Sequence, residues 1–205
     1  MQSKDVNNLK WPHIGTILAG GQSKRMGEPK EGVLLWDGKP MIDHLINTLS
    51  KITKEILILG EPKGADIKSR KDIKCIPDHK PDSGPLGGIE TLLSSNLDTE
   101  YLVVACDQPL LTVELLQKLA KSTPSSNIRL FTFESFSDIN PFPGIYPSSL
   151  LPHIKYSIQK GLTAMHEMIQ SCSDVTWIPI NQSEAALLKN INTPKDLKEL
   201  IQGKK

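Results

Sequence analysis

The apolar positions in the first half of the chain fall into short runs that alternate with segments of helical periodicity. The runs cover residues 13–19, 55–60, 73–77 and 101–106. Runs of this kind are typical of strands buried on both faces of a parallel sheet. Apolar residues recur at helical spacing between and after them, in residues 40–49, 84–96 and 113–121. This alternation predicts an α/β fold, a three-layer Rossmann-like architecture with a mostly parallel, mixed central sheet and a ligand site beyond the carboxyl ends of the strands.

The second half of the chain is less regular. Three strands and three helices are expected there, at residues 128–133, 142–146 and 175–180 and at residues 148–156, 162–171 and 194–202. The short strand at 142–146 contains and adjoins prolines, which indicate an edge position or irregular pairing. Thr193 stands directly before the last helix and is a suitable N-cap. The sheet is therefore expected to continue with one antiparallel excursion.

Length and composition favour a single globular domain. The chain has 205 residues, of which 38% are hydrophobic, an ordinary content for one core. We expect a flexible N-terminal tail at residues 1–12 and one domain at residues 13–202. The three cysteines have no metal-ligand spacing, and they are expected to remain thiols rather than to form a disulfide framework.

The charge balance excludes several classes of partner. With 24 basic and 23 acidic residues the formal net charge is +1, so no global field attracts nucleic acid or an anionic membrane surface. No apolar run approaches the roughly 20 residues of a membrane span. We therefore expect a cytoplasmic protein, a monomer or weak oligomer, in which any cationic function is local.

A glycine pair and several cations follow the first apolar run, in the stretch LAGGQSKRMGEPK. Glycines at the end of a buried strand bring unshielded backbone N–H groups close to an anion. Arginine binds phosphate oxygens bidentately, and lysine neutralises them as a point charge. The candidate ligand-binding residues of the stretch are Gly20, Gly21, Ser23, Lys24, Arg25 and Lys30. A solvated basic turn explains any one of these cations, whereas the set predicts a polyphosphate site that is neither a P-loop nor a dinucleotide fingerprint.

A carboxylate ends the run at residues 101–106, in the stretch ACDQPLL. Asp107 has the ordinary interpretation of a turn or cap residue. Because it follows a buried strand at the sheet edge where ligands bind, it is also well placed to hold a hard cation such as Mg²⁺ against phosphates. We favour the metal role, which makes Asp107 a candidate catalytic residue together with the cations Arg25 and Lys30.

Two further stretches carry polar or glycine-rich chemistry. Asp78 ends the run at residues 73–77, and the segment Gly84-Pro85-Leu86 then opens a helix whose N-terminus favours anions. A glycine-rich connection without a ligand competes with this interpretation. Asn192, in NINTP, either makes a turn and cap or points back toward the metal and phosphates.

These four stretches occur in the order and approximate spacing of the molybdenum cofactor guanylyltransferase family, which the chain resembles over nearly its whole length. The first motif is shared more widely among nucleotidyltransferases of the nucleotide-diphospho-sugar transferase fold. The turn GPLGGI is closer to the guanylyltransferases. The sequence at residues 107–109, Asp-Gln-Pro, is commoner in cytidylyltransferase relatives that act on the same cofactor. The nucleotide base therefore stays open.

The resemblance implies transfer of GMP from GTP to the terminal phosphate of molybdopterin, with or without molybdenum, with release of pyrophosphate and with Mg²⁺ as cofactor. By the same resemblance, the nucleotide contacts Leu18, Ala19, Gly20, Lys30, Arg25 and Asp78, and Asp107 holds Mg²⁺. One departure lies after Lys30, where Glu31 is an extra residue before Pro40. Transfer of CMP, transfer to a sugar phosphate, and a nucleotide-binding regulator without turnover remain alternatives. The acceptor is expected near residues 140–144 and the loop before Leu162.

Overall fold

A computed structural model of the chain describes residues 12–19, 26–67, 70, 73–77, 84–121, 126–133 and 139–203. Within these ranges one sheet contains the strands β1 Ile14–Leu18, β2 Glu55–Leu59, β3 Ile73–Ile76, β4 Glu100–Ala105, β5 Ile128–Thr132, β6 Gly144–Pro147 and β7 Val175–Pro179. The strand order is β3-β2-β1-β4-β6-β5-β7. Only β6 runs against its neighbours β4 and β5. The predicted mostly parallel, mixed sheet is thus confirmed.

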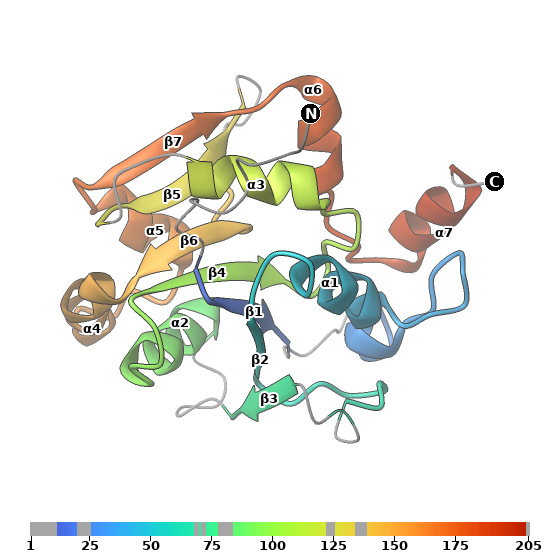
Figure 1. The fold of residues 1–205 in the computed structure, drawn as a ribbon, viewed down its shortest axis with the longest axis horizontal. Coiled ribbons are helices and arrows are strands. Elements are labelled where there is room, and N and C mark those ends of the chain that lie inside the picture. Colours follow the sequence, from blue (N-terminus) through green and yellow to red (C-terminus); the bar gives the residue numbers. More distant parts are fainter. Residues whose placement is uncertain are drawn as a thin grey trace, which may run out of the picture.

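Helices connect these strands and cover both faces of the sheet (Figure 1). The α-helices are α1 Met41–Leu49, α2 Gly84–Ser94, α3 Val113–Lys121, α4 Leu151–Gln159, α5 Met165–Gln170, α6 Gln182–Ala185 and α7 Pro194–Gln202. Short 3-10 turns are η1 Lys30–Gly32, η2 Ser148–Leu150 and η3 Ala186–Leu188. The apolar periodicity located the long helices correctly, whereas α6 was not predicted and α5 is shorter than expected.

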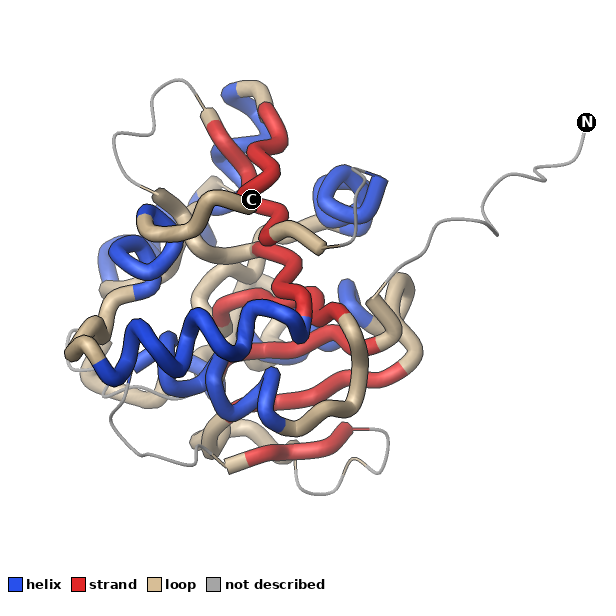
Figure 2. Tube along the Cα trace, turned by 90° about the vertical axis from the view of Figure 1, so that its left-hand side faces the viewer, coloured by secondary structure: helices blue, strands red, loops and turns tan. Residues whose placement is uncertain are grey.

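Two hydrophobic layers, one on each face of the sheet, account for the apolar runs. Successive residues of a strand point to opposite faces, so Ile17 packs in the layer under α1 and α3 while Ile14 packs in the layer under α2, α4 and α5. A strand covered on both faces has no polar side to present, and its sequence is therefore apolar throughout. Figures 1 and 2 show helices on both sides of the strands, which is the predicted three-layer arrangement.

The short strand β6 lies inside the sheet, between β4 and β5. Its prolines had indicated an edge position or irregular pairing, and the edge position is wrong. Pro143 precedes the strand and Pro147 is its last residue, so the residues between them keep their backbone N–H groups. Leu102 pairs with Ile145, and Ile145 in turn pairs with Arg129 on the other side. A proline at each end of a strand therefore does not prevent central pairing.

The sheet has a topological switch point between β1 and β4. From β1 the chain proceeds to β2 on one side, and β4 lies beside β1 on the other side. In open α/β sheets, ligands bind in the crevice outside the carboxyl ends of the strands at such a point. Leu18 pairs with Ala105, so β1 and β4 end at the same level. The segments that follow these two strands are consequently brought together.

A third, smaller apolar cluster fixes α7 at this same end of the molecule. It consists of Met26, Val33, Leu35, Met41, Ile191 and Leu200. These residues come from the segment after β1, from α1, from the segment that precedes α7 and from α7 itself. In Figure 1, β4 points toward the side of the molecule on which α7 lies. The last helix therefore packs beside the start of α1, on the side of the molecule toward which β4 points.

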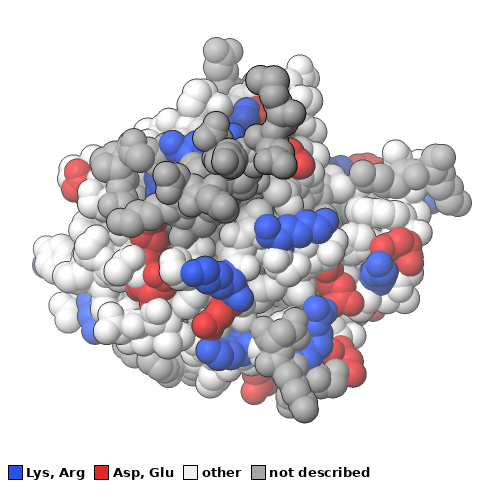
Figure 3. All heavy atoms as spheres, in the orientation of Figure 1, with Lys and Arg blue, Asp and Glu red and all other residues white. Residues whose placement is uncertain are grey.

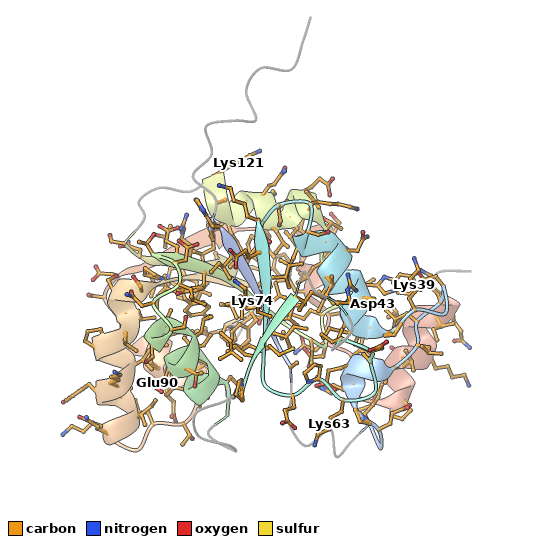
Figure 4. All side chains as sticks on the ribbon, turned by 60° about the horizontal axis from the view of Figure 1, so that its bottom comes forward. Lys39, Asp43, Lys63, Lys74, Glu90 and Lys121 are labelled. Carbon is orange, nitrogen blue, oxygen red and sulfur yellow. The ribbon has the colours of Figure 1, made fainter. Side chains whose placement is uncertain are left out.

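Charged side chains on the surface are interspersed. Figure 3 shows Lys and Arg next to Asp and Glu on one face, without a field of one sign. Several of them are paired, for example Lys74 of β3 with Glu55 at 2.7 Å and Asp43 of α1 with Arg70 at 3.2 Å; Lys74 and Asp43 are labelled in Figure 4. Across the described residues, no helix combines the length and the apolar character needed to span a bilayer.

The turn η1, which begins with Lys30, is in close contact with the loop that follows β2. A Cβ atom on Gly32 would lie 2.6 Å from the carbonyl carbon of Gly64 and still closer to its oxygen. Gly64 itself has a φ of +77°, which disfavours a side chain there. Because these atoms of Gly64 belong to the main chain, they could move away from a side chain at residue 32 only if the whole loop shifted. Gly32 therefore allows the loop and the turn to pack directly.

We expect Gly32→Ala to shift η1, to destabilise the protein by about 1–3 kcal/mol through overpacking, and to lower activity. Urea unfolding and steady-state kinetics provide the measurements. Gly203→Ala is the matched control, because its Cβ would be 3.5 Å from the nearest atom at the end of α7. Equal effects of both substitutions would contradict a specific contact at Gly32.

Candidate functional site

Three polar side chains from distant parts of the sequence meet beyond the carboxyl end of β4. The ammonium group of Lys30 donates to Asp107 Oδ2 at 3.1 Å. It also donates to Asn192 Oδ1. The side chains of Lys30 and Asp107 are only 16% and 14% exposed. The structure thus brings together three candidate residues, and we call them the Lys30 cluster.

Sheet pairing places Asp107. The amide of Cys106 donates to the carbonyl of Leu18 at 3.1 Å, which extends the β1–β4 ladder by one residue beyond Ala105. Asp107 then lies in the turn that leaves the sheet. Its carbonyl accepts a hydrogen bond of 2.8 Å from the amide of Ile191. The backbone of Asp107 is therefore fixed both to the sheet and to the segment that carries Asn192.

The cap of α7 places Asn192. Thr193 is the N-cap, as predicted, and its side chain accepts from the amide of Asp196 at 3.1 Å. Asp196 Oδ2 accepts from the amides of Asn192 and Thr193 at 3.0 and 2.8 Å. This reciprocal capping box satisfies donors that the start of a helix leaves unpaired. Asn192 is therefore held by the helix start while its side chain reaches Lys30.

The donor set of the Lys30 cluster fits Mg²⁺. Asp107 Oδ1 is buried and has no hydrogen-bond partner among the described residues. A buried, unpaired carboxylate oxygen is unfavourable, and a hard cation satisfies it. Within the described part of the chain, no group of three His, Cys, Asp or Glu side chains is placed to hold a metal by itself. This is compatible with Mg²⁺, which is usually bound by one or two carboxylates together with substrate phosphates and water.

Cys106, next to Asp107, is unsuited to nucleophilic chemistry. Burial raises the pKa of its thiol, and the nearby carboxylates of Asp107 and Glu31 raise it further. The reactive form of cysteine is the thiolate, which these surroundings suppress. Glu31, the extra residue after Lys30, is only 3% exposed. The candidate chemistry is therefore that of positioned charges rather than that of a covalent intermediate.

The candidate nucleotide-binding residues are described only in part. Leu18 ends β1 beside β4 and Ala19 follows it, while Gly84 and Pro85 begin α2 with exposed positions. Leu86 is completely buried in the core, so its contribution to a ligand is limited to its backbone. Gly20, Gly21, Ser23, Lys24, Arg25 and Asp78 lie outside the described residues, and their roles stay predictions.

Sequence reasoning did not single out Gln108 as a site residue. Its side chain is 1% exposed, and its amide group donates to the carbonyls of Phe142 and Leu188 at 2.8 and 3.3 Å. The available signal was a polar residue within the otherwise apolar surroundings of Asp107. Its two distant partners cannot be predicted from the sequence, because Phe142 lies in the loop before β6 and Leu188 ends the short turn η3, and neither segment has a periodic pattern.

Comparison with solved structures defines the class of fold. Molybdopterin-guanine dinucleotide biosynthesis protein A from Archaeoglobus fulgidus superimposes with a TM-score of 0.76 at 23% identity, over 92% of this chain and 97% of that one. A 2-C-methyl-D-erythritol 4-phosphate cytidylyltransferase from Thermus thermophilus gives 0.69 at 14% identity, with the same two coverages. The fold is that of the nucleotidyltransferases of the nucleotide-diphospho-sugar transferase type, as predicted.

Comparison of sequences identifies the family. Residues 15–175 match the MobA-like NTP transferase domain. A probable molybdenum cofactor guanylyltransferase from Flavobacterium johnsoniae is 37% identical over 90% of this chain and 94% of its own length. A molybdenum cofactor guanylyltransferase from Xanthomonas euvesicatoria is 31% identical over 94% and 96%. The chain belongs to the MobA-like NTP transferase family, and the resemblance seen in the motifs is confirmed.

The capping box predicts a pH dependence of stability. The hydroxyl of Thr193 and then the amide of Asn192 lower the pKa of Asp196 below its ordinary value of 3.8. A carboxyl with a lowered pKa in the folded state stabilises the fold above its unfolded pKa, and this contribution is lost as the pH falls through the folded value.

We therefore expect Asp196→Asn to lower the free energy of unfolding at pH 7 and the difference from wild type to shrink as the pH falls below about 4. Urea unfolding at a series of pH values measures this difference. Asp66→Asn, at an exposed loop position, is the control. A difference that does not change with pH would contradict the assignment.

Proposed function

We propose that this protein is a molybdenum cofactor guanylyltransferase, which transfers GMP from GTP to the terminal phosphate of molybdopterin and releases pyrophosphate. The observation that carries the proposal is the Lys30 cluster, a cation, a carboxylate and an amide gathered at the switch point of a nucleotidyltransferase fold. The family of the chain and the names of its relatives, which it matches over most of their length, support the same activity.

The reaction requires alignment rather than a protein nucleophile. A phosphate oxygen of molybdopterin forms a bond to the α-phosphorus of GTP while the bond from that phosphorus to the β-bridging oxygen breaks, and the electron pair leaves with pyrophosphate. Because the attacking oxygen is already anionic, no general base is needed. The protein must bring two anionic reactants together and compensate their repulsion, which is positional and electrostatic catalysis.

In this proposal the residues of the Lys30 cluster have separate roles: two hold the metal ion, and one neutralises phosphate charge. Asp107, with Asn192 beside it, would hold Mg²⁺, which when bound supplies positive charge for the phosphate oxygens. Lys30 neutralises the phosphates of the nucleotide and the departing pyrophosphate, and Arg25 assists from the same loop. The first residues of α2 and the end of β1 present backbone groups to the nucleotide.

We also propose where the acceptor binds and which partners the protein has. The acceptor lies near residues 140–144 and the loop before Leu162. Just beyond that loop, the carbonyl oxygen of Thr163 lies 3.7 Å from a Cβ placed on Gly84 at the start of α2. GTP and a molybdopterin-type acceptor are then the partners of a cytoplasmic monomer or weak oligomer. Transfer of CMP or transfer to a sugar phosphate would use the same phosphate machinery. A regulator that binds nucleotide without turnover is the alternative outside enzymes.

The metal role of Asp107 predicts that Asp107→Asn lowers kcat by about 10²- to 10³-fold while the thermal unfolding profile stays cooperative. The amide keeps the shape of the side chain and removes the negative charge that a cation needs. Pyrophosphate release from GTP and molybdopterin at several Mg²⁺ concentrations measures the effect, with Asp66→Asn as the control. Wild-type turnover of Asp107→Asn would exclude the assignment.

Guanine preference predicts selective stabilisation by GTP. A ligand at 100 times its Kd adds about 2.7 kcal/mol to the free energy of unfolding, which for a domain of this size corresponds to about 5–10 °C in Tm. Thermal unfolding with Mg²⁺ and GTP, CTP, UTP or ATP compares the bases directly. A larger shift with CTP would support the cytidylyl alternative, and a GTP shift without pyrophosphate release with any acceptor would support the regulator.

A further inference from the structure

A buried amide connects the carboxylate of the site to the second half of the molecule. Gln108 directly follows Asp107 and is 1% exposed. Its Nε2 donates to the carbonyl of Phe142 at 2.8 Å and to the carbonyl of Leu188 at 3.3 Å. These partners are 34 and 80 residues further along the chain. One side chain therefore joins three segments at the rim of the crevice.

We propose that Gln108 is a positioning residue, which sets the distance of Asn192 and of the 139–144 loop from Asp107. This inference rests on the proposed function, because it takes Asp107 and Asn192 as members of the active site. Gln108 does not reach the reactants through its own side chain, since that side chain is buried and both of its hydrogens are donated to backbone carbonyls.

The first contact, with Leu188, controls the approach of Asn192. Leu188 ends η3, and only three residues separate it from Asn192. The amide of Ile191 within this span donates to the carbonyl of Asp107 at 2.8 Å. The segment is thus fixed at two points, by the side chain of Gln108 and by the backbone of Asp107. Two fixed points define both the position and the direction of the chain that enters α7.

The second contact, with Phe142, controls the loop before β6. Phe142 is 7% exposed, and its amide donates to Asn140 Oδ1 at 3.2 Å. Its carbonyl is satisfied by Gln108. The loop borders the crevice on the side assigned to the acceptor. Gln108 therefore connects the wall for the acceptor and the segment of Asn192 to the same point beside Asp107.

The unused oxygen of Gln108 strengthens this interpretation. Oε1 is buried and has no hydrogen-bond partner among the described residues. The orientation of the amide follows from its surroundings, because two carbonyl oxygens can accept only from the NH₂ end. An apolar side chain of similar size would avoid the cost of the unpaired oxygen. What glutamine adds at this position is its two donors, and both are directed at segments of the active site.

Gln108→Met tests the proposal, since methionine has a similar length and no donor. We expect kcat to fall by about 10²-fold, the loss associated with misplacement of active-site groups by about 1 Å, and KM for the acceptor to rise while binding of GTP changes less. Hydrogen exchange at the amide of Ile191 is expected to accelerate at least tenfold. Exchange in α3 should not change. Gln117→Met, in α3, is the matched control for the loss of a glutamine.

A double-mutant cycle with Asn192→Ala separates positioning from a general loss of stability. If Gln108 acts on kcat through Asn192, the kcat of the double variant will be little lower than that of Asn192→Ala alone, while the rise in KM for the acceptor, which reports the Phe142 contact, will persist. Ile145→Val truncates a fully buried residue of β6 and serves as a destabilised control. Any loss of kcat that it causes should multiply with the loss caused by Asn192→Ala. Multiplying effects for Gln108→Met, or unchanged exchange at Ile191, would overturn the proposal.

Failure of the proposed function gives a different result. In that case the wild-type protein would release no pyrophosphate from GTP and molybdopterin, while the exchange measurement at Ile191 would still report whether Gln108 holds the segment. If Gln108→Met gave fast exchange at Ile191 together with wild-type kinetics, Gln108 would hold the segment without affecting catalysis. This result would overturn the positioning role.

Discussion

The parallel pairing of β1 with β4 is the constraint on which the rest of the site depends. Leu18 pairs with Ala105, and the ladder continues to the amide of Cys106 before both chains leave the sheet. Because the strands end at one level, the loop after β1 and the turn with Asp107 must share the same crevice. The burial of both strands in two apolar layers makes a change of register costly, since it would exchange the faces of their side chains.

Around this constraint the protein assembles a site from weakly restrained parts. Lys30 belongs to the short 3-10 turn η1, Asp107 lies in the turn after β4, and Asn192 is the residue before the N-cap of α7. None of these positions is rigid by itself. Each is fixed by a contact of its main chain. Gly32 of η1 packs against Gly64, the carbonyl of Asp107 accepts from the amide of Ile191, and the amide of Asn192 donates to the carboxylate of Asp196. The arrangement of the Lys30 cluster therefore depends on these supporting contacts.

The sequence allowed prediction of those features that depend on local chemistry. Apolar runs located β1 and β4, and the residues Thr193 and Pro194 identified the start of α7. The motifs predicted that Asp107 and Lys30 serve one phosphate site, and the pairing of β1 with β4, which the structure shows, brings them together. The position of β6 and the partners of Gln108 could not be predicted, because long-range pairing of a four-residue strand and of a single amide leaves no periodic pattern. The interior place of β6 depends on its two neighbours rather than on its own composition.

The separation of the site residues along the chain has a consequence for folding. Asn192 lies 162 residues after Lys30, so closing their contact requires one of the longest loops that the chain can form. Closing such a loop costs more entropy than pairing neighbouring elements, so we expect this contact to follow the formation of local helices and adjacent strands. A nascent chain can thus complete most of its sheet while the site is still open. We therefore expect the Lys30 cluster to assemble together with the docking of α7, among the last events of folding.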